Sequence, residues 1–509
     1  MSDRVPLNAE MVESICARLD ASPLPEQDRT IIKAMMRDYL RLGQAFIEKS
    51  HSIRRLLRMI FGTTEKASKI MPELKAMARP QKNKKPRGHG RNGASSYTGG
   101  RKASVPHASL KKGDLCPECR KGKVYPTEPG VTVRITGNAP LTATSFECEK
   151  LRCNLCGEVF TAKPDEGPEK YDATAGVMIA LMRYGTGVPF KRLEQLQEGL
   201  GIPLPASTQW DIVEKAAMSA HPPYRELVRQ AAQDEIIHLD DTTMKILASV
   251  NENGRSGTFT TGMLSVAGKR KIALFFTGQK HAGENLADLL AKRHKDLGPP
   301  IQMADALSRN VPKEFSTLLA NCLAHARRNF IDVAESFPEE CRHVIKVLAK
   351  VYEHDARAKE MSPHERLTYH EARSGPLMDN LREWMNAQFD EKQVEPNSGL
   401  GKAFSYMLNH WDPLTLFLRV PGAPLDNNAV ERSLKMAIRH RRNSLFFRTL
   451  HGAYIGDLFM SLIHTCRLSQ INPFDYLVAL QKHSHEVFKN PQEWLPWNYG
   501  AAVTGLSPP

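Results

Sequence analysis

The stretch from about residue 234 constrains the fold most, because apolar segments and turn residues alternate along it. EIIHLDD, GTFTTGMLSVAG and KRKIALFFTG predict three successive strands. AGENLADLLAKRH then predicts a helix, and PPIQMAD predicts a short apolar strand. Three strands, a helix and a strand indicate an α/β layer with a mixed sheet.

Helical segments flank this layer on both sides. PFKRLEQLQEGLGI and PASTQWDIVEKAA predict two helices joined by a Gly/Pro turn, with Ser207 or Thr208 as N-cap of the second. The pair resembles a helix-turn-helix, although a common helical hairpin fits as well. Residues 326–420 predict further helices, one of them beginning at Ser362 with Pro363 and Glu365 behind it. A last helix is expected from about Asp426.

The charge of the chain is strongly one-sided, with 70 Lys and Arg against 56 acids and a net charge of +14. Between Arg79 and Lys112 there are ten basic residues and no acid, in a Gly-, Ser- and Pro-rich context. Such a segment predicts a flexible linker that follows DNA phosphates, the alternative being a solvated spacer. The expected DNA contacts there are Lys82, Lys84, Lys85, Arg87, Arg91, Arg101 and Lys102.

Several classes of protein are disfavoured. The sequence contains no run of 18 apolar residues, and MSDRVPLNAE lacks the apolar core of a signal peptide. Nine cysteines, four of them in two Cys-x-x-Cys pairs, fit metal binding in a reducing compartment better than a disulfide framework. We therefore expect a cytoplasmic, nucleoid-associated protein without a membrane partner.

The N-terminal region has a heptad pattern. Ile32, Tyr39, Phe46, Ile53 and Ile60 repeat every seven residues, and a second series runs through Met35, Leu42, Lys49 and Leu56. Two such seams predict a coiled coil and a homo-oligomer, the alternative being an amphipathic helix packed on its own domain.

Two Cys-x-x-Cys knuckles form the strongest local motif. Cys116 and Cys119 precede Cys153 and Cys156 by a spacing that allows four thiolates around one tetrahedral Zn²⁺. Strands expected at KGKVY and VTVRITG would make this module similar to a zinc ribbon. Because protein fills all four positions, the zinc is expected to be structural.

Acidic residues stand at the ends of the predicted elements. Asp240 and Asp241 close the first strand, Asp305 closes the last, and Glu431 lies on the helix after Asp426. Converging carboxylates can hold two Mg²⁺ ions for phosphodiester chemistry. Spacing alone leaves other roles open, since Asp241 also fits a turn and Asp426 an N-cap.

Two further groups lie near these acids. Cys322 and His325 form a Cys-x-x-His that could be half a metal site; because no second half is visible, a structural role near the sheet is expected. Beyond Glu431 the chain is basic, and Lys435, Arg439 and Arg442 are expected to contact DNA. Lys435 could equally form a helix-supporting pair with Glu431.

These motifs resemble the transposases of the insertion sequence 66 family. The resemblance is carried by HLDDTTMKIL, IQMADALSRN, NCLAHARRNF and LDNNAVERSLKMAIRHRRNSLFF, in this order. RRLLRMIFGTTEK, GHGRNGA, the Cys-x-x-Cys pairs and INPFDYL extend it over about residues 30–485.

The resemblance implies a D-D-E transposase with an RNase H-like core. Asp240, Asp305 and Glu431 would then be the catalytic residues and the ligands of two Mg²⁺ ions, with Mn²⁺ as a substitute. Asp241 stands where a glutamate is usual in the family. Cys322 and His325 match a signature with a structural role. Element ends and target DNA would be the partners, together with accessory proteins of the same element.

The expected organisation is an α/β RNase H-like core with a helical insertion, preceded by smaller modules. The segments are a helical, coiled-coil-like oligomerisation segment (1–75), a basic linker (76–113), a zinc-binding module (114–162), a helix-turn-helix-like region (163–230), the first part of the core (231–330), the helical insertion (331–420), the last part of the core (421–465) and a helical tail (466–509). Such a chain would cleave the ends of its own insertion sequence and join their 3′-OH groups to target DNA. A zinc-containing DNA-binding regulator and a nuclease without strand transfer are the alternatives.

Overall fold

The computed structural model describes residues 14–15, 17–19, 25–36, 104–127, 135, 138–152, 154, 156, 158–163, 169–248 and 257–505. Residues 80–140 form a small unit, and the remainder of the chain is assigned to a large one. The boundary between the two units, at residue 140, falls inside the predicted zinc module at 114–162. That module therefore remains a prediction. In the part of the chain that the structure describes, no helix has the length and apolarity needed to cross a bilayer.

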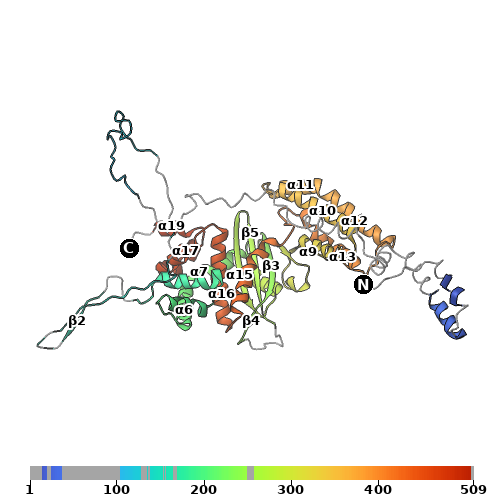
Figure 1. The fold of residues 1–509 in the computed structure, drawn as a ribbon, viewed down its shortest axis with the longest axis horizontal. Coiled ribbons are helices and arrows are strands. Elements are labelled where there is room, and N and C mark those ends of the chain that lie inside the picture. Colours follow the sequence, from blue (N-terminus) through green and yellow to red (C-terminus); the bar gives the residue numbers. More distant parts are fainter. Residues whose placement is uncertain are drawn as a thin grey trace. The chain divides into compact units, whose positions relative to one another are not determined.

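A five-stranded mixed sheet lies at the centre of the large unit (Figure 1). Its strands are β3 (Ile236–Thr243), β5 (Phe259–Ala267), β6 (Arg270–Gly278), β7 (Ile301–Ala304) and β8 (Leu318–Asn321), in the order β6-β5-β3-β7-β8. The first three pair antiparallel, whereas β7 runs parallel to both β3 and β8. The predicted mixed sheet is confirmed. The prediction missed β8, because four residues ahead of a helix carry little strand signal.

The two faces of the sheet are covered by different helices. Gly262 on β5 lies under Leu434 of α15 (Asn428–Ser444), so closely that an added Cβ would be 2.7 Å from Leu434 Cδ2. On the opposite face, Asn285 of α8 (Ala282–Leu290) donates to Thr261 at 2.8 Å. Adjacent strand residues point to opposite faces, so Gly262 and Thr261 identify the two sides.

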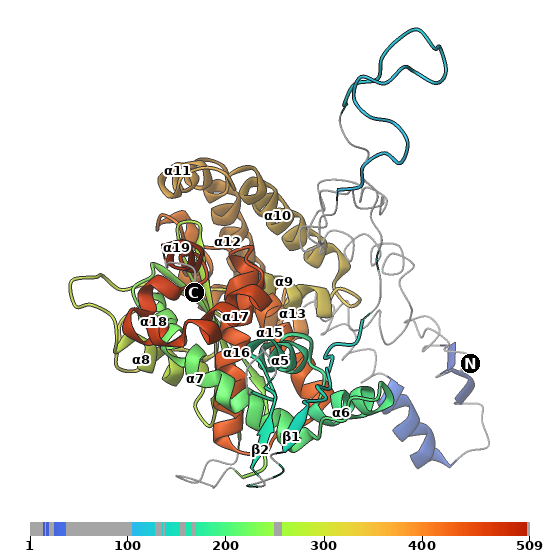
Figure 2. The ribbon, with the colours of Figure 1, turned by 90° about the vertical axis from the view of Figure 1, so that its left-hand side faces the viewer.

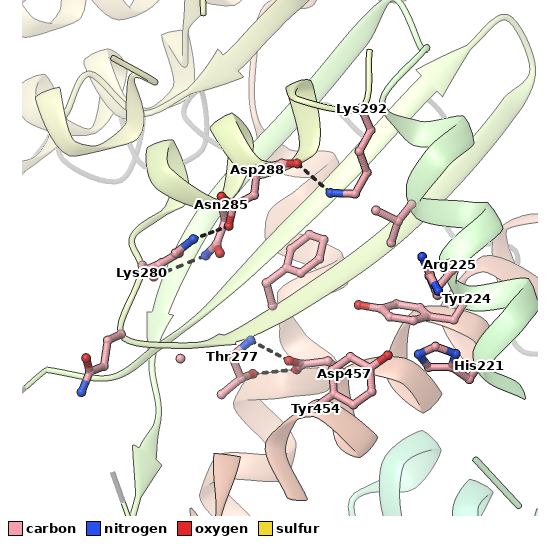
Figure 3. Close-up of a pocket in the computed structure, with 14 residues that line it drawn as sticks. His221, Tyr224, Arg225, Thr277, Lys280, Asn285, Asp288, Lys292, Tyr454 and Asp457 are labelled. Carbon is pink, nitrogen blue, oxygen red and sulfur yellow. Dashed lines mark hydrogen bonds and ion pairs between the residues drawn. The ribbon is translucent and has the colours of Figure 1, made fainter. Parts of the chain in front are cut away.

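The edge strand β6 is closed by side chains of α16 (Leu450–Leu468). Asp457, Ser461 and Thr465 accept the backbone N–H groups of Thr277, Phe275 and Ala273 at 2.6, 3.0 and 3.1 Å. Figure 3 shows the two bonds from Thr277 to Asp457, one from its backbone nitrogen and one from its hydroxyl. Residues four apart on one helix face advance about 6 Å, which matches every second residue of a strand. Burial raises the pKa of Asp457 to about 7, although both bonds from Thr277 lower it.

Before the sheet come the helices of the predicted helix-turn-helix region. They are α5 (Ala173–Ala180), the π-helix η2 (Leu181–Thr186), α6 (Phe190–Gly199) and α7 (Ala206–Ala231). The two predicted helices are confirmed, but the predicted N-cap is wrong. Helix α7 begins at Ala206, before Ser207, because the carboxylate of Glu194 on α6 accepts the Ala206 N–H at 3.1 Å. Because this cap comes from another helix, the sequence next to the start of α7 contains no capping residue that would indicate it.

Residues 323–418, which follow β8, are mostly helical, as predicted for 326–420, and appear beside the sheet in Figure 1. Ser362 and Glu365 form the expected capping box of α11. Apolar residues of this region form a core together with Met303 and Ala320 of the sheet. The helices are α9 (Leu323–Asp332), α10 (Pro338–Arg357), α11 (Pro363–Arg373), α12 (Gly375–Asp390), α13 (Gly399–Asn409), α14 (Trp411–Leu414) and the 3-10 helix η5 (Leu416–Leu418).

The C-terminal helices belong to the main core of the large unit. Tyr476, Leu477 and Leu480 of α17 (Pro473–Lys482) are buried in the same cluster as Ile463 of α16. Helices α7, α16 and α17 pack together (Figure 2). The predicted boundary at 465/466 falls inside α16. Helix α18 (Ser484–Lys489), the 3-10 helix η6 (Pro491–Trp494) and α19 (Tyr499–Gly505) complete this end.

The N-terminal predictions are described only in part. Residues 26–36 are helical, and the heptad positions beyond them lie outside the described residues. The seven basic residues expected to contact DNA, from Lys82 to Lys102, also lie outside them. Of VTVRITG the structure describes Ile135, whereas β1 (Lys150–Arg152) and β2 (Val159–Thr161) form an antiparallel pair further on.

Candidate active site

The sheet register places two of the predicted acids side by side. Parallel strands β3 and β7 pair up to His238 and Met303, and Asp240 and Asp305 each follow two residues later. Both therefore lie on the same face of the sheet, Asp305 directly after β7 and Asp240 within β3. The prediction that Asp240 and Asp241 close the first strand is wrong, because pairing with β5 continues β3 to Thr243. Asp240 also pairs with Gly262, so it faces α15.

The third acid reaches this point because Asn427 fixes the start of α15. The buried side chain of Asn427 donates to the Leu239 carbonyl at 2.9 Å, and its Oδ1 lies 3.2 Å from His238 Nδ1. Its backbone N–H donates to Cys322 Sγ at 3.3 Å. Glu431 lies one turn further along the helix, close enough for its charge to act on Asp240. The local pattern gave no indication of this role for Asn427.

His325 connects two of the acids. Its Nδ1 lies 2.7 Å from Asp305 Oδ1, and its Nε2 lies 3.9 Å from Glu431 Oε1. The Asp305 carboxylate, and after it the Cys322 side chain, raise the pKa of His325 to about 10. The imidazole therefore carries a positive charge that offsets part of the repulsion between the carboxylates. The sequence predicted a structural role for His325, and no position beside the acids was foreseen.

The raised pKa of Asp240 reflects its burial and the closeness of the other two acids. Burial comes first among the causes that raise its pKa to about 6, followed by the negative charges of Asp305 and Glu431. The backbone N–H of Asp241 donates to Asp240 Oδ1 at 2.8 Å and acts against this shift. An acid whose charge is disfavoured by two neighbouring carboxylates gains from a bound cation.

Several polar atoms of the cluster are buried without hydrogen-bond partners among the described residues. They are Asp305 Oδ1, Glu431 Oε1 and His325 Nδ1. The Asp305 and Glu431 side chains remain 21% and 32% exposed, so the cluster is reachable from solvent. Carboxylate oxygens of this kind are the ligands that Mg²⁺ prefers. The residues present thus fit a divalent cation.

Asp241 does not belong to this cluster. Its Oδ1 accepts the Thr261 hydroxyl at 2.6 Å, and its Oδ2 accepts the Ala282 backbone N–H at 3.0 Å. Oδ2 also lies 3.2 Å from His281 Nδ1. Asp241 therefore fastens the start of α8 to the far face of the sheet.

A separate cavity of about 490 Å³ opens on the side of α8, next to α7 and α16 (Figure 3). His221, Tyr224 and Arg225 line it together with Tyr454 and Asp457. None of Asp240, Asp305 and Glu431 lines this cavity. The carboxylate cluster is therefore a distinct site.

The basic residues beyond Glu431 lie on one exposed face of α15. Arg432, Lys435, Arg439 and Arg442 are all exposed and follow one another at helical spacings of three or four residues. Arg441 faces the sheet instead, donating to the Thr242 hydroxyl at 2.9 Å and the Thr243 carbonyl at 2.7 Å.

The Cys116–Cys119 knuckle is well formed within the small unit. The Cys116 N–H donates to the Gly122 carbonyl at 2.7 Å, and the Gly122 N–H donates to Cys119 Sγ at 3.4 Å. This backbone donor is the first cause that lowers the pKa of Cys119. Cys156 is exposed in the large unit, and Cys153 lies outside the described residues.

Known proteins match the segment that builds the carboxylate cluster. The sequence model of the transposase IS66 family matches residues 171–455, which is more than half of the chain and includes all three acids. This chain belongs to the transposase IS66 family. The match extends from α5 into α16 and includes the whole sheet, so the family assignment and the site geometry concern the same structural unit.

Relatives from Sinorhizobium fredii are similar to this transposase-family chain. The uncharacterized protein y4hP is 27% identical over 379 residues, which are 70% of this chain and 67% of the relative. The uncharacterized protein y4jD is 32% identical over 192 residues, or 37% of each chain. The chain thus matches little more than a third of the length of one relative and two thirds of the other.

Proposed function

We propose that this chain is a DNA transposase that binds the ends of its own insertion sequence, cleaves them and joins the 3′-OH ends to target DNA. The observation that carries the proposal is the convergence of Asp240, Asp305 and Glu431 from β3, the end of β7 and α15. Family membership supports the same activity. The mixed sheet, with Asp240 and Asp305 on its adjacent strands β3 and β7, supports an RNase H-like core.

Asp240, Asp305 and Glu431 would hold two divalent cations, Mg²⁺ or Mn²⁺ in its place. Such a pair stabilises the attacking and leaving oxygens of a phosphodiester displacement. Asp240 would be the acid suited to serve both cations, because the negative charges of Asp305 and Glu431 both act on it. Hydrolysis at the element end frees a 3′-OH, which then attacks a target phosphodiester. The chain's own contribution is to position the scissile phosphate and to keep the three carboxylates together.

The exposed basic face of α15 would hold the DNA backbone beside the acids. Phosphate contacts of this kind position the duplex without reading bases. Replacing Lys435, Arg439 and Arg442 together by Gln is expected to lower the slope of log affinity against log salt by about 2–3. Gln at exposed Lys359, Lys392 and Lys402 of the insertion provides a charge-matched control. Equal slopes for the two triple variants would remove α15 from the DNA interface.

The remaining modules would supply end recognition and assembly. Four cysteines, Cys116, Cys119, Cys153 and Cys156, would bind a structural Zn²⁺, and the α6–α7 hairpin and the basic linker would contact DNA. The N-terminal helical segment would provide the homo-oligomer that joining two ends requires. Cys119→Ser should lower both the zinc content and the folding stability, because structural zinc contributes directly to folding. Unchanged zinc would refute this ligand set.

The catalytic assignment is tested with Asp305→Asn and Glu431→Gln on labelled DNA carrying the element ends. We expect both variants to bind these ends as the wild type does and to lose Mg²⁺-dependent cleavage. Asp296→Asn, an exposed acid five residues before β7, should retain it. Cleavage near the wild-type rate in either site variant would overturn the assignment. Cleavage by the wild type without strand-transfer products would identify a nuclease instead.

A further inference from the structure

The Cys-x-x-His motif gains a partner in the tertiary structure. Side-chain ligand atoms of Asp305, Cys322 and His325 all lie within 4.8 Å of one another. They come from two places in the chain, the end of β7 and the start of α9. The three side chains offer sulfur, nitrogen and oxygen to one point.

The backbone places the Cys322 sulfur at the start of α9. Cys322 is the N-cap residue of this ten-residue helix. Its Sγ also accepts the Asn427 N–H at 3.3 Å. Cys322 itself is fully buried, but the neighbouring Asp305 and His325 side chains are each 21% exposed. A cation can therefore reach the group from the solvent side of these two residues.

The nitrogen and oxygen atoms are also available to a cation. His325 Nδ1 and Asp305 Oδ1 lie 2.7 Å apart, yet neither has a hydrogen-bond partner among the described residues. Their contact is an ion pair without hydrogen-bond geometry. A metal ion would replace the proton of the imidazole, because the neutral ring is the form that ligates.

We propose that Asp305, Cys322 and His325 form a site for a borderline-soft divalent cation of the Zn²⁺ class. Thiolate and imidazole ligands select such ions over Mg²⁺, and three protein ligands leave one position open. The site would share Asp305 with the proposed magnesium pair. A thiophilic cation held there would then compete for Asp305 and inhibit Mg²⁺-dependent cleavage. This inhibition rests on the proposed function, whereas the binding itself does not.

The test is a Co²⁺ titration of the full-length protein without DNA, after its zinc has been removed with a chelator. We expect the wild type to bind one more equivalent of Co²⁺ than Cys322→Ser, and to show stronger thiolate-to-cobalt absorption than this variant. Cys466→Ser is the matched control, since it removes a fully buried thiol on α16 whose pKa is raised by burial. It should match the wild type in stoichiometry and absorption.

A second variant guards against misfolding of Cys322→Ser. His325→Gln should likewise lose the additional equivalent while circular dichroism shows that it is folded. Equal Co²⁺ stoichiometry and absorption in the wild type and a folded Cys322→Ser or His325→Gln variant would overturn the proposal. Because neither DNA nor cleavage enters the measurement, this outcome is separate from failure of the transposase assignment.

Discussion

Asp240 and Asp241 are neighbours on β3, yet their carboxylates lie on opposite faces of the sheet. Asp240 faces α15 together with Gly262, whereas Asp241 accepts hydrogen bonds from Thr261 and the start of α8. The alternation of a β-strand therefore separates a residue of the carboxylate cluster from a residue that fixes the fold.

This separation predicts opposite effects on stability. Asp241→Ala leaves the Thr261 hydroxyl and the Ala282 N–H without an acceptor, and should lower the free energy of unfolding by about 1–3 kcal/mol. Asp240→Asn removes one of three clustered charges and should raise it by about 1–3 kcal/mol. Urea unfolding at pH 7.5 with EDTA measures both. Destabilisation by Asp240→Asn would contradict the repulsion between the acids.

Gly262 should be required for the close approach of α15. An added Cβ would lie 2.7 Å from Leu434 Cδ2, so Gly262→Ala must displace the Leu434 side chain and strain the packing of the helix that carries Glu431. We expect a loss of about 1–3 kcal/mol in unfolding free energy. Leu434→Ala in the same chain should recover part of that loss relative to the sum of the single variants. Gly278→Ala, where nothing lies within 4 Å, is the control. Additive effects would exclude direct contact as the cause.

Because side chains of α16 cover the edge of β6, the loss of a buried hydroxyl there should destabilise the fold more than the loss of an exposed hydroxyl elsewhere. Thr465→Val keeps the shape but leaves the N–H and carbonyl of Ala273 unpaired, and should cost about 1–3 kcal/mol. Thr368→Val removes an exposed hydroxyl that bonds only within α11 and should be nearly neutral. Hydrogen exchange at the Ala273 amide should accelerate in Thr465→Val. Unchanged exchange would show that α16 does not protect this edge.

His440 should make the fold sensitive to acid. It is fully buried, stacks on Phe447 with 4.6 Å between ring centroids, and neither ring nitrogen has a hydrogen-bond partner among the described residues. Burial, and after it the charge of Arg183, lower the pKa of His440 to about 3. The unfolded chain binds the proton near its ordinary pKa of about 6.5, so this contribution to stability is lost as pH falls below that value.

The matching experiment compares His440→Phe with the wild type at pH 7.5 and 5.0. Between these values the variant should lose about 2 kcal/mol less unfolding free energy than the wild type, because its ring cannot be protonated. His364→Phe, with an exposed side chain, controls for the loss of one histidine. An equal pH effect in wild type and His440→Phe would show that His440 is protonated in the folded protein.

Much of the architecture was predictable because its signals are local. The alternation of apolar and turn residues predicted four of the five central strands, and the capping box at Ser362 and Glu365 predicted the start of α11. Strand β8 and the cap of α7 by Glu194 were missed, because one is very short and the other depends on a separate helix. The sequence indicated the acids near the ends of its expected elements, although Asp240 lies within β3, and spacing alone could not distinguish Asp240 from Asp241.

The sequence by itself determined which residue types are available, since strand ends, helix spacing and the family motifs follow from neighbours along the chain. Only the tertiary structure decided which of them meet. Asn427 brings Glu431 to β3, Gly262 admits α15, and Asp305 completes a group with Cys322 and His325. These relationships join residues separated by about 20 to almost 200 positions, where no local pattern carries information about distance. Packing and sheet register decide such contacts, because they act through space and not along the chain.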